Sequence, residues 1–166
     1  MSAHDQSTSE QEQRVVELLK DSKVAMLTYL DPSGKLLSKP MATQDVDFDG
    51  TLSFIAERGS DKVQALVADS RVNVSYSNNG SWVSVAGTAS VVNDETKLKE
   101  LWSSFTDSWL EGGPENPENV LVEVTPDSAE YWSAPGGSTI ISLTNLVKAK
   151  LTGSRIEGDN EQVDLR

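Results

Sequence analysis

Alternation of apolar and polar residues is the dominant pattern in this chain, and it predicts β-strands. It is clearest from Arg71 to Tyr76, where every second side chain is apolar, as in a strand that buries one face. Further apolar stretches predict strands over residues 23–30, 35–44, 51–56, 81–92 and 120–132, the last being one long bent strand or a strand pair. Turn sequences at 31–34, 49–50 and 78–80 favour hairpins. Gly87 marks an expected bend.

Apolar residues spaced three or four apart predict helices between these strands. The first runs from residue 8 to residue 21, with a capping box formed by Ser9 and Glu12, and another covers residues 61–68. A third starts near Asp94, and its spacing favours core positions for Leu98, Leu101, Trp102 and Phe105. Residues 111–119 are predicted to form a loop, and a last helix is predicted from its N-cap Ser138 to about residue 150.

Six strands joined mostly by hairpins, with helices between them, predict a mainly β fold of the α+β type. We expect a small six-stranded antiparallel barrel with flanking helices. Residues 8–155 are predicted to form a single domain, between a disordered tail over residues 1–7 and a polar C-terminal tail over residues 156–166. In that last tail only Val163 and Leu165 hint at a strand.

Composition narrows the function classes. The chain has 26 acidic against 14 basic residues and a formal net charge of −12, which argues against binding nucleic acid or an anionic membrane. It has no cysteine, and its one histidine, His4, lies in the N-terminal tail. A serine triad therefore lacks its base, and a histidine metal cluster cannot be built. Chemistry is expected from a bound cofactor, and with neither a signal sequence nor a spanning segment evident, we expect a cytoplasmic protein.

The turn Gly59-Ser60-Asp61-Lys62, at the start of the predicted helix 61–68, carries the first functional signal. A helix N-terminus presents unpaired N–H groups and the positive end of the helix dipole, so a hydroxyl and an ammonium beside it make a phosphate cradle. The alternative is structural, with Ser60 as an N-cap and Lys62 as a solvated residue of the first turn. By itself the turn favours this structural interpretation.

A set of short blocks in a fixed order resembles the pyridoxamine 5′-phosphate oxidase-like family, in particular its general stress protein branch. The resemblance spans residues 12–155, and the blocks are Ser38–Met41, Phe54–Lys62, Asp69–Tyr76, Val85–Ala89, Leu101-Trp102, Trp109–Gly113 and Glu130–Trp132. It implies a flavin-binding split β-barrel that forms a homodimer, with FMN (FAD being possible) at the subunit interface.

The resemblance also implies site residues. Lys39 matches a basic residue that contacts the FMN phosphate or ribityl chain, and Trp109 and Trp132 match side chains that cover the ring, from the partner subunit. The cofactor-binding residues implied in this way are Lys39, Pro40, Met41, Ile55, Ala56, Ser60, Lys62, Trp109 and Trp132. No catalytic side chain and no metal ligand is implied. The competing interpretation for the tryptophans is core filling, which is stronger for Trp82 and Trp102.

Three departures separate this chain from the vitamin B6 oxidases of the family. Asp61 stands where those oxidases carry a second basic residue, and a carboxylate there must point away from a phosphate or weaken its binding. Ala56 lacks a hydroxyl found in related oxidases, a hydrogen bond of ~0.5–1.5 kcal/mol. After Trp132, residues 133–139 contain no Arg or His to hold a substrate phosphate, so vitamin B6 oxidation is not expected. Arg58 is either a compensating cation or a solvated loop residue.

The leading hypothesis is a homodimeric FMN-binding protein of the general stress type that acts as an oxidoreductase on NAD(P)H or a small organic substrate. One alternative is a non-enzymatic protein that binds or stores flavin. Another is a split barrel that binds a different flat phosphorylated ligand, such as a deazaflavin. Haem degradation is disfavoured, because the related barrels use a histidine to bind iron and this chain has only His4.

Overall fold

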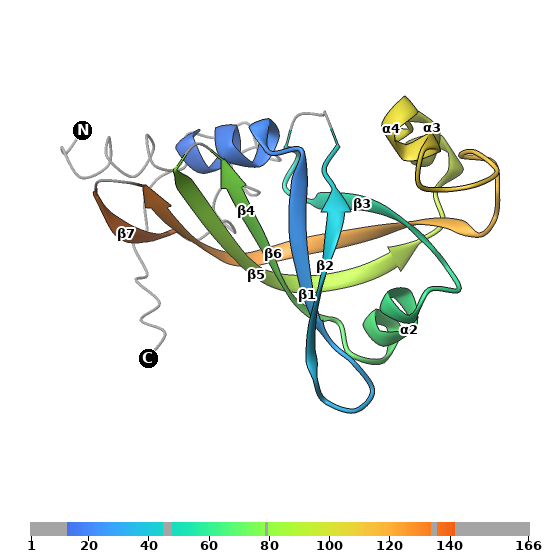
Figure 1. Ribbon diagram of the computed structural model, residues 1–166, viewed down its shortest axis with the longest axis horizontal. Helices are drawn as coiled ribbons and strands as arrows, with labels where there is room; N and C mark the ends of the chain where they lie inside the picture. Colours follow the sequence, from blue (N-terminus) through green and yellow to red (C-terminus); the bar gives the residue numbers. More distant parts are fainter. Residues whose placement is uncertain (1–12, 45–47, 79, 134–135, 142–166) are drawn as a thin grey trace.

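The computed structural model describes residues 13–44, 48–78, 80–133 and 136–141 (Figure 1). A helix covers residues 13–21 and precedes the first strand. The remaining elements are β1 (Val24–Leu30), β2 (Leu36–Ala42), β3 (Leu52–Glu57), α2 (Asp61–Ala68), β4 (Arg71–Asn78), β5 (Ser81–Val92), α3 (Glu95–Leu101), α4 (Ser104–Asp107), β6 (Asn119–Ser133) and β7 (Gly136–Ile141).

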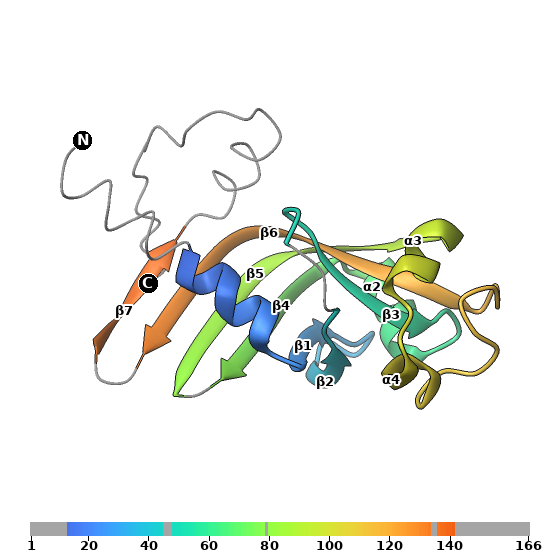
Figure 2. The ribbon, with the colours of Figure 1, turned by 90° about the horizontal axis from the view of Figure 1, so that it is seen from above.

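All strands belong to one antiparallel sheet with the order β2-β1-β4-β5-β6-β3, and β7 pairs with β6 beside this path. The sheet curls, and its two edge strands β2 and β3 approach each other without forming a ladder (Figures 1 and 2). We call this meeting of β2 and β3 the seam. The arrangement confirms the predicted fold class, a six-stranded antiparallel split barrel with flanking helices.

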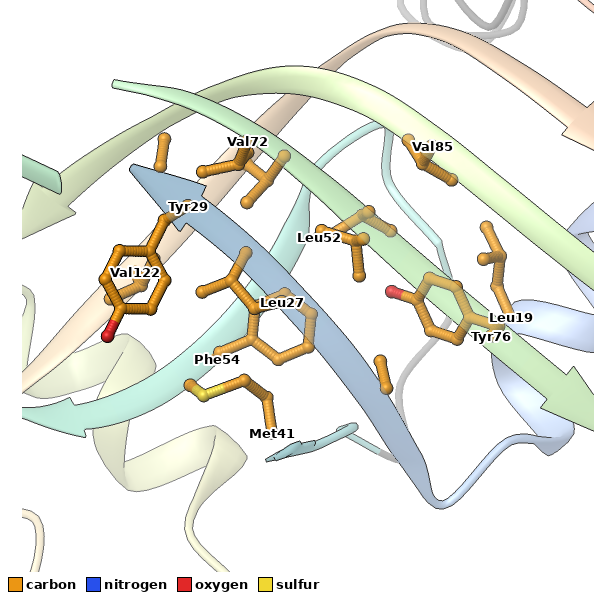
Figure 3. Packing of buried hydrophobic residues seen from close by; sticks show 14 of the residues in the cluster. Leu19, Leu27, Tyr29, Met41, Leu52, Phe54, Val72, Tyr76, Val85 and Val122 are labelled. Atoms are coloured by element: carbon orange, nitrogen blue, oxygen red, sulfur yellow. The ribbon is translucent and has the colours of Figure 1, made fainter. Parts of the chain in front are cut away.

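The core fills the inside of the curled sheet. Alternation along β3 and β4 buries one face of each strand: Phe54 is 1% exposed and Val74 is 0% exposed. Figure 3 shows Leu27, Phe54 and Met41 lying together between β1, β3 and β2. The helix over residues 13–21 lies over one face of the sheet (Figure 2) and adds Val15, Leu18 and Leu19 to this core.

The bend in β5 has a packing cause. The register between β5 and β6 shifts between Ala86 and Gly87. A Cβ atom at Gly87 would lie 2.4 Å from the backbone oxygen of Thr125 on β6, so only glycine permits this close approach. The predicted bend is therefore confirmed, and β6 is one long strand rather than a pair.

The single helix predicted from Asp94 is wrong. α3 ends at Leu101, and Trp102 has extended backbone angles (φ −68°, ψ 131°). Ser103 then begins a new helix, because its side chain accepts a hydrogen bond from the Thr106 N–H in a capping box. Leu98 and Leu101 are buried as predicted, but the break leaves Phe105 49% exposed and Trp102 partly exposed, so their predicted core positions are wrong.

The helix predicted from Ser138 is also wrong where it can be compared. Residues Gly136–Ile141 form β7, which pairs antiparallel with β6. The β-branched residues Thr139, Ile140 and Ile141 favour a strand over a helix. The rest of that helix, the start of the first helix, the tails over residues 1–7 and 156–166, and the strand hint at Val163 and Leu165 lie outside the described residues. Where the structure describes the chain, no helix is both long and apolar enough to cross a membrane.

Candidate functional site

A cavity of about 320 Å³ lies at the seam. Its walls come from both edge strands, from the start of α2, from α4 and from the turn that follows α4. In Figure 1, α4 lies above β3 and α2 lies below it. The lining residues are Val24, Pro40, Met41, Ala42, Gln44, Ile55, Ala56, Glu57, Ser60, Lys62, Phe105, Thr106, Trp109 and Leu110.

The start of α2 forms one part of the cavity wall. Ser60 is the N-cap of this helix, and its Oγ accepts a hydrogen bond from the Val63 N–H at 3.4 Å. The same hydroxyl donates to the backbone oxygen of Glu57 at 2.7 Å. The Ser60 proton is thus already engaged, whereas the N–H groups of Asp61 and Lys62 have no acceptor within the helix.

Lys62 is the one cation among the described residues that line the cavity. Its Nζ lies 3.0 Å from the Met41 sulfur, a weak acceptor that compensates an ammonium poorly. Burial lowers the pKa of Lys62, nearby Lys39 lowers it further, and Glu57 opposes both. A partly buried ammonium beside a thioether is an anion-binding group with little existing compensation.

Lys39 does not line the cavity. It lies on the exposed edge strand β2, in register with Leu27 of β1, and is itself exposed. It is nevertheless close enough to Lys62 to lower the pKa of that residue. Two lysines therefore flank the same end of the seam, one inside the cavity and one beside it.

An aromatic pair forms another part of the wall. The ring centroids of Phe105 and Trp109 are 6.2 Å apart with an interplanar angle of 54°, and the two residues are 49% and 74% exposed. Trp109 is positioned by its backbone N–H, which donates to the Thr106 oxygen at 3.0 Å. The following loop is held by Asn119, whose Nδ2 donates to the backbone oxygens of Glu111 and Gly113.

Seven of the nine residues predicted to bind a cofactor line this one cavity. They are Pro40, Met41, Ile55, Ala56, Ser60, Lys62 and Trp109. Residues from positions 40 to 109 of the chain are therefore brought together by the curl of the sheet. Their proximity is observed, and their binding role stays a prediction.

Trp132 lies elsewhere in the same chain. It is opposite Trp82 in the β5–β6 ladder and lines a different hollow together with Val24 and Met26. Within one subunit it does not contribute to the seam cavity. Its predicted contact with the flavin ring stays a prediction. The resemblance implied that Trp109 also reaches the ring from the partner subunit, whereas Trp109 lines the cavity of its own chain.

Asp61, Ala56 and Arg58, which the sequence left open as obstacles or aids to phosphate binding, have distinct positions in the structure. Asp61 is exposed and does not line the cavity, whereas Ala56 lines the cavity but is only 2% exposed as a residue. The Arg58 guanidinium donates to the backbone oxygen of Pro117 (3.2 and 3.3 Å) and to the Asn93 side chain. Arg58 therefore holds the loop before β6 from a partly exposed position, and it does not line the cavity as a compensating cation would.

Seven cavity residues were missed from sequence: Val24, Ala42, Gln44, Glu57, Phe105, Thr106 and Leu110. Phe105 could have been identified, because Phe105 and Trp109 are four residues apart and such residues share one face of a helical turn. Glu57 lies within the block Phe54–Lys62, but the resemblance implied no role for it. Across the part of the chain that the structure describes, no group of three or more His, Cys, Asp or Glu residues is placed to hold a metal ion.

Comparison with known families explains the arrangement. The profile described as pyridoxamine 5′-phosphate oxidase like matches residues 10–157. The chain belongs to this family. This chain is also 32% identical over 122 residues to Protein bli-3 of Neurospora crassa. The match covers 66% of this chain and 58% of bli-3. The chain thus matches a little over half the length of that curated relative.

Solved structures of similar fold include proteins described as general stress proteins. General Stress Protein 26 of Bacillus anthracis superposes with a TM-score of 0.70 at 22% identity, over 80% of this chain and 98% of that one. A general stress protein 26 of Jannaschia sp. CCS1 gives 0.64 at 27% identity, over 90% and 94%. The general stress FMN/FAD binding protein of Xanthomonas citri gives 0.68 at 23% identity, over 78% and 93%.

Proposed function

We propose that this protein binds a flavin in the seam cavity and acts as a flavin-dependent oxidoreductase of the general stress type. The observation that carries the proposal is that one cavity combines an aromatic pair, Phe105 and Trp109, with a poorly compensated lysine, Lys62. A flat apolar ring and a phosphate on one molecule need both of these features.

The residues present fit such a ligand. Trp109 and Phe105 offer aromatic faces to the ring, and the backbone of Ile55 and Ala56 lies at the free edge of β3. Lys62 and the first-turn N–H groups of α2 offer charge and donors to a phosphate. FMN is the proposed cofactor, and FAD is the other candidate. When bound, the flavin supplies the hydride-transfer chemistry, and the chain's own groups bind and orient it.

The proposal includes a homodimer with the flavin at the subunit interface. Apolar side chains of Val24, Met26 and Trp82, on the same outer side as Trp132, are 46%, 39% and 46% exposed. A partner subunit that covered them would bring its own Trp132 toward the first subunit's cavity. NAD(P)H or a small organic molecule is the proposed substrate, and the absence of Arg and His in residues 133–139 argues against a vitamin B6 phosphate.

Flavin binding without turnover is the second candidate. Among the described cavity residues only Glu57 and Lys62 carry ionisable side chains. The Lys62 ammonium contacts a thioether, and the Ser60 hydroxyl is engaged by the backbone of Glu57, so no acid–base pair is set up at the cavity. The same observation leaves room for another flat phosphorylated ligand, such as a deazaflavin.

The primary test is titration of purified protein with FMN, followed by quenching of flavin fluorescence. We expect saturable binding that Lys62→Met weakens, because the variant removes the cation that faces the phosphate. Lys35→Met is the matched control, since Lys35 lies in the exposed β1–β2 turn and outside the cavity. Absence of any FMN binding, or an equal effect of both variants, would contradict the proposal.

Two further measurements separate the candidates. Photoreduced, FMN-loaded protein is mixed with quinones, and the oxidised form with NADH or NADPH, while the flavin absorbance is followed. Turnover supports the oxidoreductase, whereas saturable binding without any reaction supports the binding or storage protein. Mass spectrometry of the ligand that co-purifies decides between FMN, FAD and a deazaflavin, and light scattering measures the oligomeric state.

A further inference from the structure

The side-chain ends of Met41 and Lys62 meet at the wall of the seam cavity. Met41 on β2 and Lys62 on α2 both line the cavity, and the Lys62 Nζ lies 3.0 Å from the Met41 sulfur. Among the described residues, this sulfur is the acceptor for that ammonium. A thioether is a weak acceptor, so the contact is a weak hydrogen bond that a better acceptor at the same place would strengthen.

Met41 is almost closed off from the outer surface but adjoins an open space. The residue is 3% exposed, and Figure 3 shows it beside Leu27 and Phe54 of the core. The cavity it lines has a volume of about 320 Å³. One water takes up about 30 Å³ in the liquid, so hydrogen peroxide, with two oxygen atoms, is small enough to enter. The ammonium engages one lone pair of the sulfur and leaves the other for an oxidant.

We propose that Met41 is an oxidation site which a peroxide reaches through the empty cavity, and that the sulfoxide formed there holds the Lys62 ammonium. The sulfur donates an electron pair to one oxygen of hydrogen peroxide, and the O–O bond breaks. The other oxygen takes the proton of the transferred one and leaves as water. The sulfur is oxidised by two electrons and the peroxide is reduced by the same two. The modification turns an apolar side chain into a polar one, and sulfoxide reductases reverse it.

The new oxygen forms next to a strong donor. A sulfoxide oxygen at a residue that is 3% exposed needs a hydrogen-bond partner, and the Lys62 ammonium already lies at the atom that carries it. A charge-assisted hydrogen bond therefore forms with little movement. A ligand phosphate then has to compete with the sulfoxide for the same ammonium. This last consequence rests on the proposed flavin binding, whereas the oxidation and the contact with Lys62 do not.

The first measurement follows the oxidation. Full-length protein is treated with hydrogen peroxide in the dark, and peptide mass spectrometry measures the sulfoxide at Met41 and at Met26, which is 39% exposed and outside the seam cavity. We expect Met41 to be oxidised within about tenfold of the Met26 rate, and saturating FMN to slow Met41 by about fivefold or more, because it fills the route to the sulfur. Oxidation of Met41 only in urea-unfolded protein would overturn the proposal.

The second measurement follows Lys62 without any flavin. Acetic anhydride acetylates neutral amines, and a hydrogen bond to a sulfoxide favours the ammonium form. In the Met26→Leu variant, peroxide treatment should therefore slow acetylation of Lys62 about threefold. Lys35, in the exposed β1–β2 turn, should be unaffected. In the double variant Met26→Leu/Met41→Leu the treatment should change neither lysine. Met1 is present in both variants, so its oxidation cancels in the comparison.

The third measurement compares two flavins after the peroxide has been removed. Oxidised Met26→Leu is expected to bind FMN about fivefold more weakly than the untreated variant, and riboflavin less than about twofold more weakly, because riboflavin has no phosphate to compete for Lys62. The double variant treated in the same way should bind both flavins unchanged. Methionine sulfoxide reductase should restore FMN binding to oxidised Met26→Leu.

The outcomes separate the two proposals. If FMN binds the untreated protein but oxidation of Met41 leaves Lys62 acetylation or FMN affinity unchanged, the role of Met41 is wrong while the proposed flavin function stands. Loss of the native circular dichroism signal on oxidation also overturns it, because general disruption of the core would then explain weaker binding. If no flavin binds, the proposed function fails, and the rates of oxidation and acetylation still decide whether a Met41 sulfoxide forms and holds Lys62.

Discussion

The centre of the sheet and its seam belong to the same sheet, yet their side chains differ in exposure. In the centre, Val74 on β4, Val85 on β5 and Val122 on β6 are all 0% exposed. At the seam, Phe105 and Trp109 are 49% and 74% exposed, and Lys62 has a thioether for a neighbour. Central strands have a partner on each side, whereas β2 and β3 each have one partner among the described strands.

This difference shows where the fold commits its residues to stability and where it leaves groups available for a ligand. A saturated core stabilises the protein but offers no contact to a small molecule. Exposed aromatics and a poorly compensated lysine contribute little to stability, or oppose it, and become favourable only when something covers them. The four predictions below test this division.

The largest expected effect belongs to the centre. Phe54→Ala should lower the free energy of unfolding by about 3–5 kcal/mol, because it removes a large side chain that is 1% exposed and leaves a cavity. Phe105→Ala at the seam should change it by less than about 1 kcal/mol. Urea unfolding followed by circular dichroism measures both, and equal costs would show that the seam is as fully packed as the core.

A glycine pair sharpens the same contrast. Gly87→Ala is expected to cost about 1–3 kcal/mol, because its Cβ would meet the Thr125 backbone oxygen at 2.4 Å. Gly59→Ala, which meets nothing within 4 Å and needs no left-handed backbone, is expected to be neutral or to stabilise by up to about 1 kcal/mol. Thermal unfolding of the two variants measures the difference, and a neutral Gly87→Ala would contradict the close approach of β5 and β6.

A substitution at the seam should change ligand affinity more than it changes the free energy of unfolding. Trp109→Ala should weaken FMN binding by about 1 kcal/mol, roughly fivefold, through the loss of ring contact, while the free energy of unfolding changes by less than about 0.5 kcal/mol. Val67→Ala is the matched control, because Val67 is 72% exposed on α2 and lies outside the cavity. Isothermal titration measures the affinities, and an unchanged FMN affinity in Trp109→Ala would remove Trp109 from the site.

The smallest effect concerns Lys62 in the ligand-free protein. The pKa of Lys62 in the folded protein is lowered by burial and by Lys39. At a pH between the folded and unfolded pKa values, the unfolded state therefore binds more protons than the folded state. The contribution of Lys62 to the free energy of unfolding consequently rises with pH. Lys62→Met should therefore stabilise the protein at pH 7 by about 0.5 kcal/mol, a small gain because Lys62 is only partly buried. The gain should shrink as pH approaches 10, and a variant less stable at pH 7 would contradict this account.

The success of the sequence-based predictions follows the same division between the centre of the sheet and the rest of the fold. Apolar stretches between turn sequences, with clean alternation over residues 71–76, located all six strands of the main sheet, since such patterns are local signals. The glycine within the fifth strand located the bend at Gly87. The break after Leu101 was missed, because Ser103 and Thr106 form a capping box that interrupts an apparently continuous helical pattern. β7 was missed because the Pro135-Gly136-Gly137 break and Ser138 were interpreted as a helix start.

The site could be predicted only in part, because some of its residues belong to local motifs and others do not. Ser60 and Lys62 belong to one local turn, and family blocks pointed to Trp109, so these positions could be assigned without knowing the fold. Glu57 became relevant only when its place in the cavity wall was known. The position of Arg58 depended on Pro117, 59 residues away in sequence, and no local pattern reports such a contact.

The pairing of β3 has a consequence for how the chain is made. Among the strands that the structure describes, its only ladder partner is β6, and Leu52 pairs with Val124, 72 residues further along the chain. During synthesis β3 therefore stays unpaired, with an apolar face and a free edge, until β6 has left the ribosome. Long-range pairing of this kind slows folding and exposes strands that can associate with other chains. The cavity is among the last parts of the protein to form, so a ligand that binds there can favour only chains that are already complete through β6.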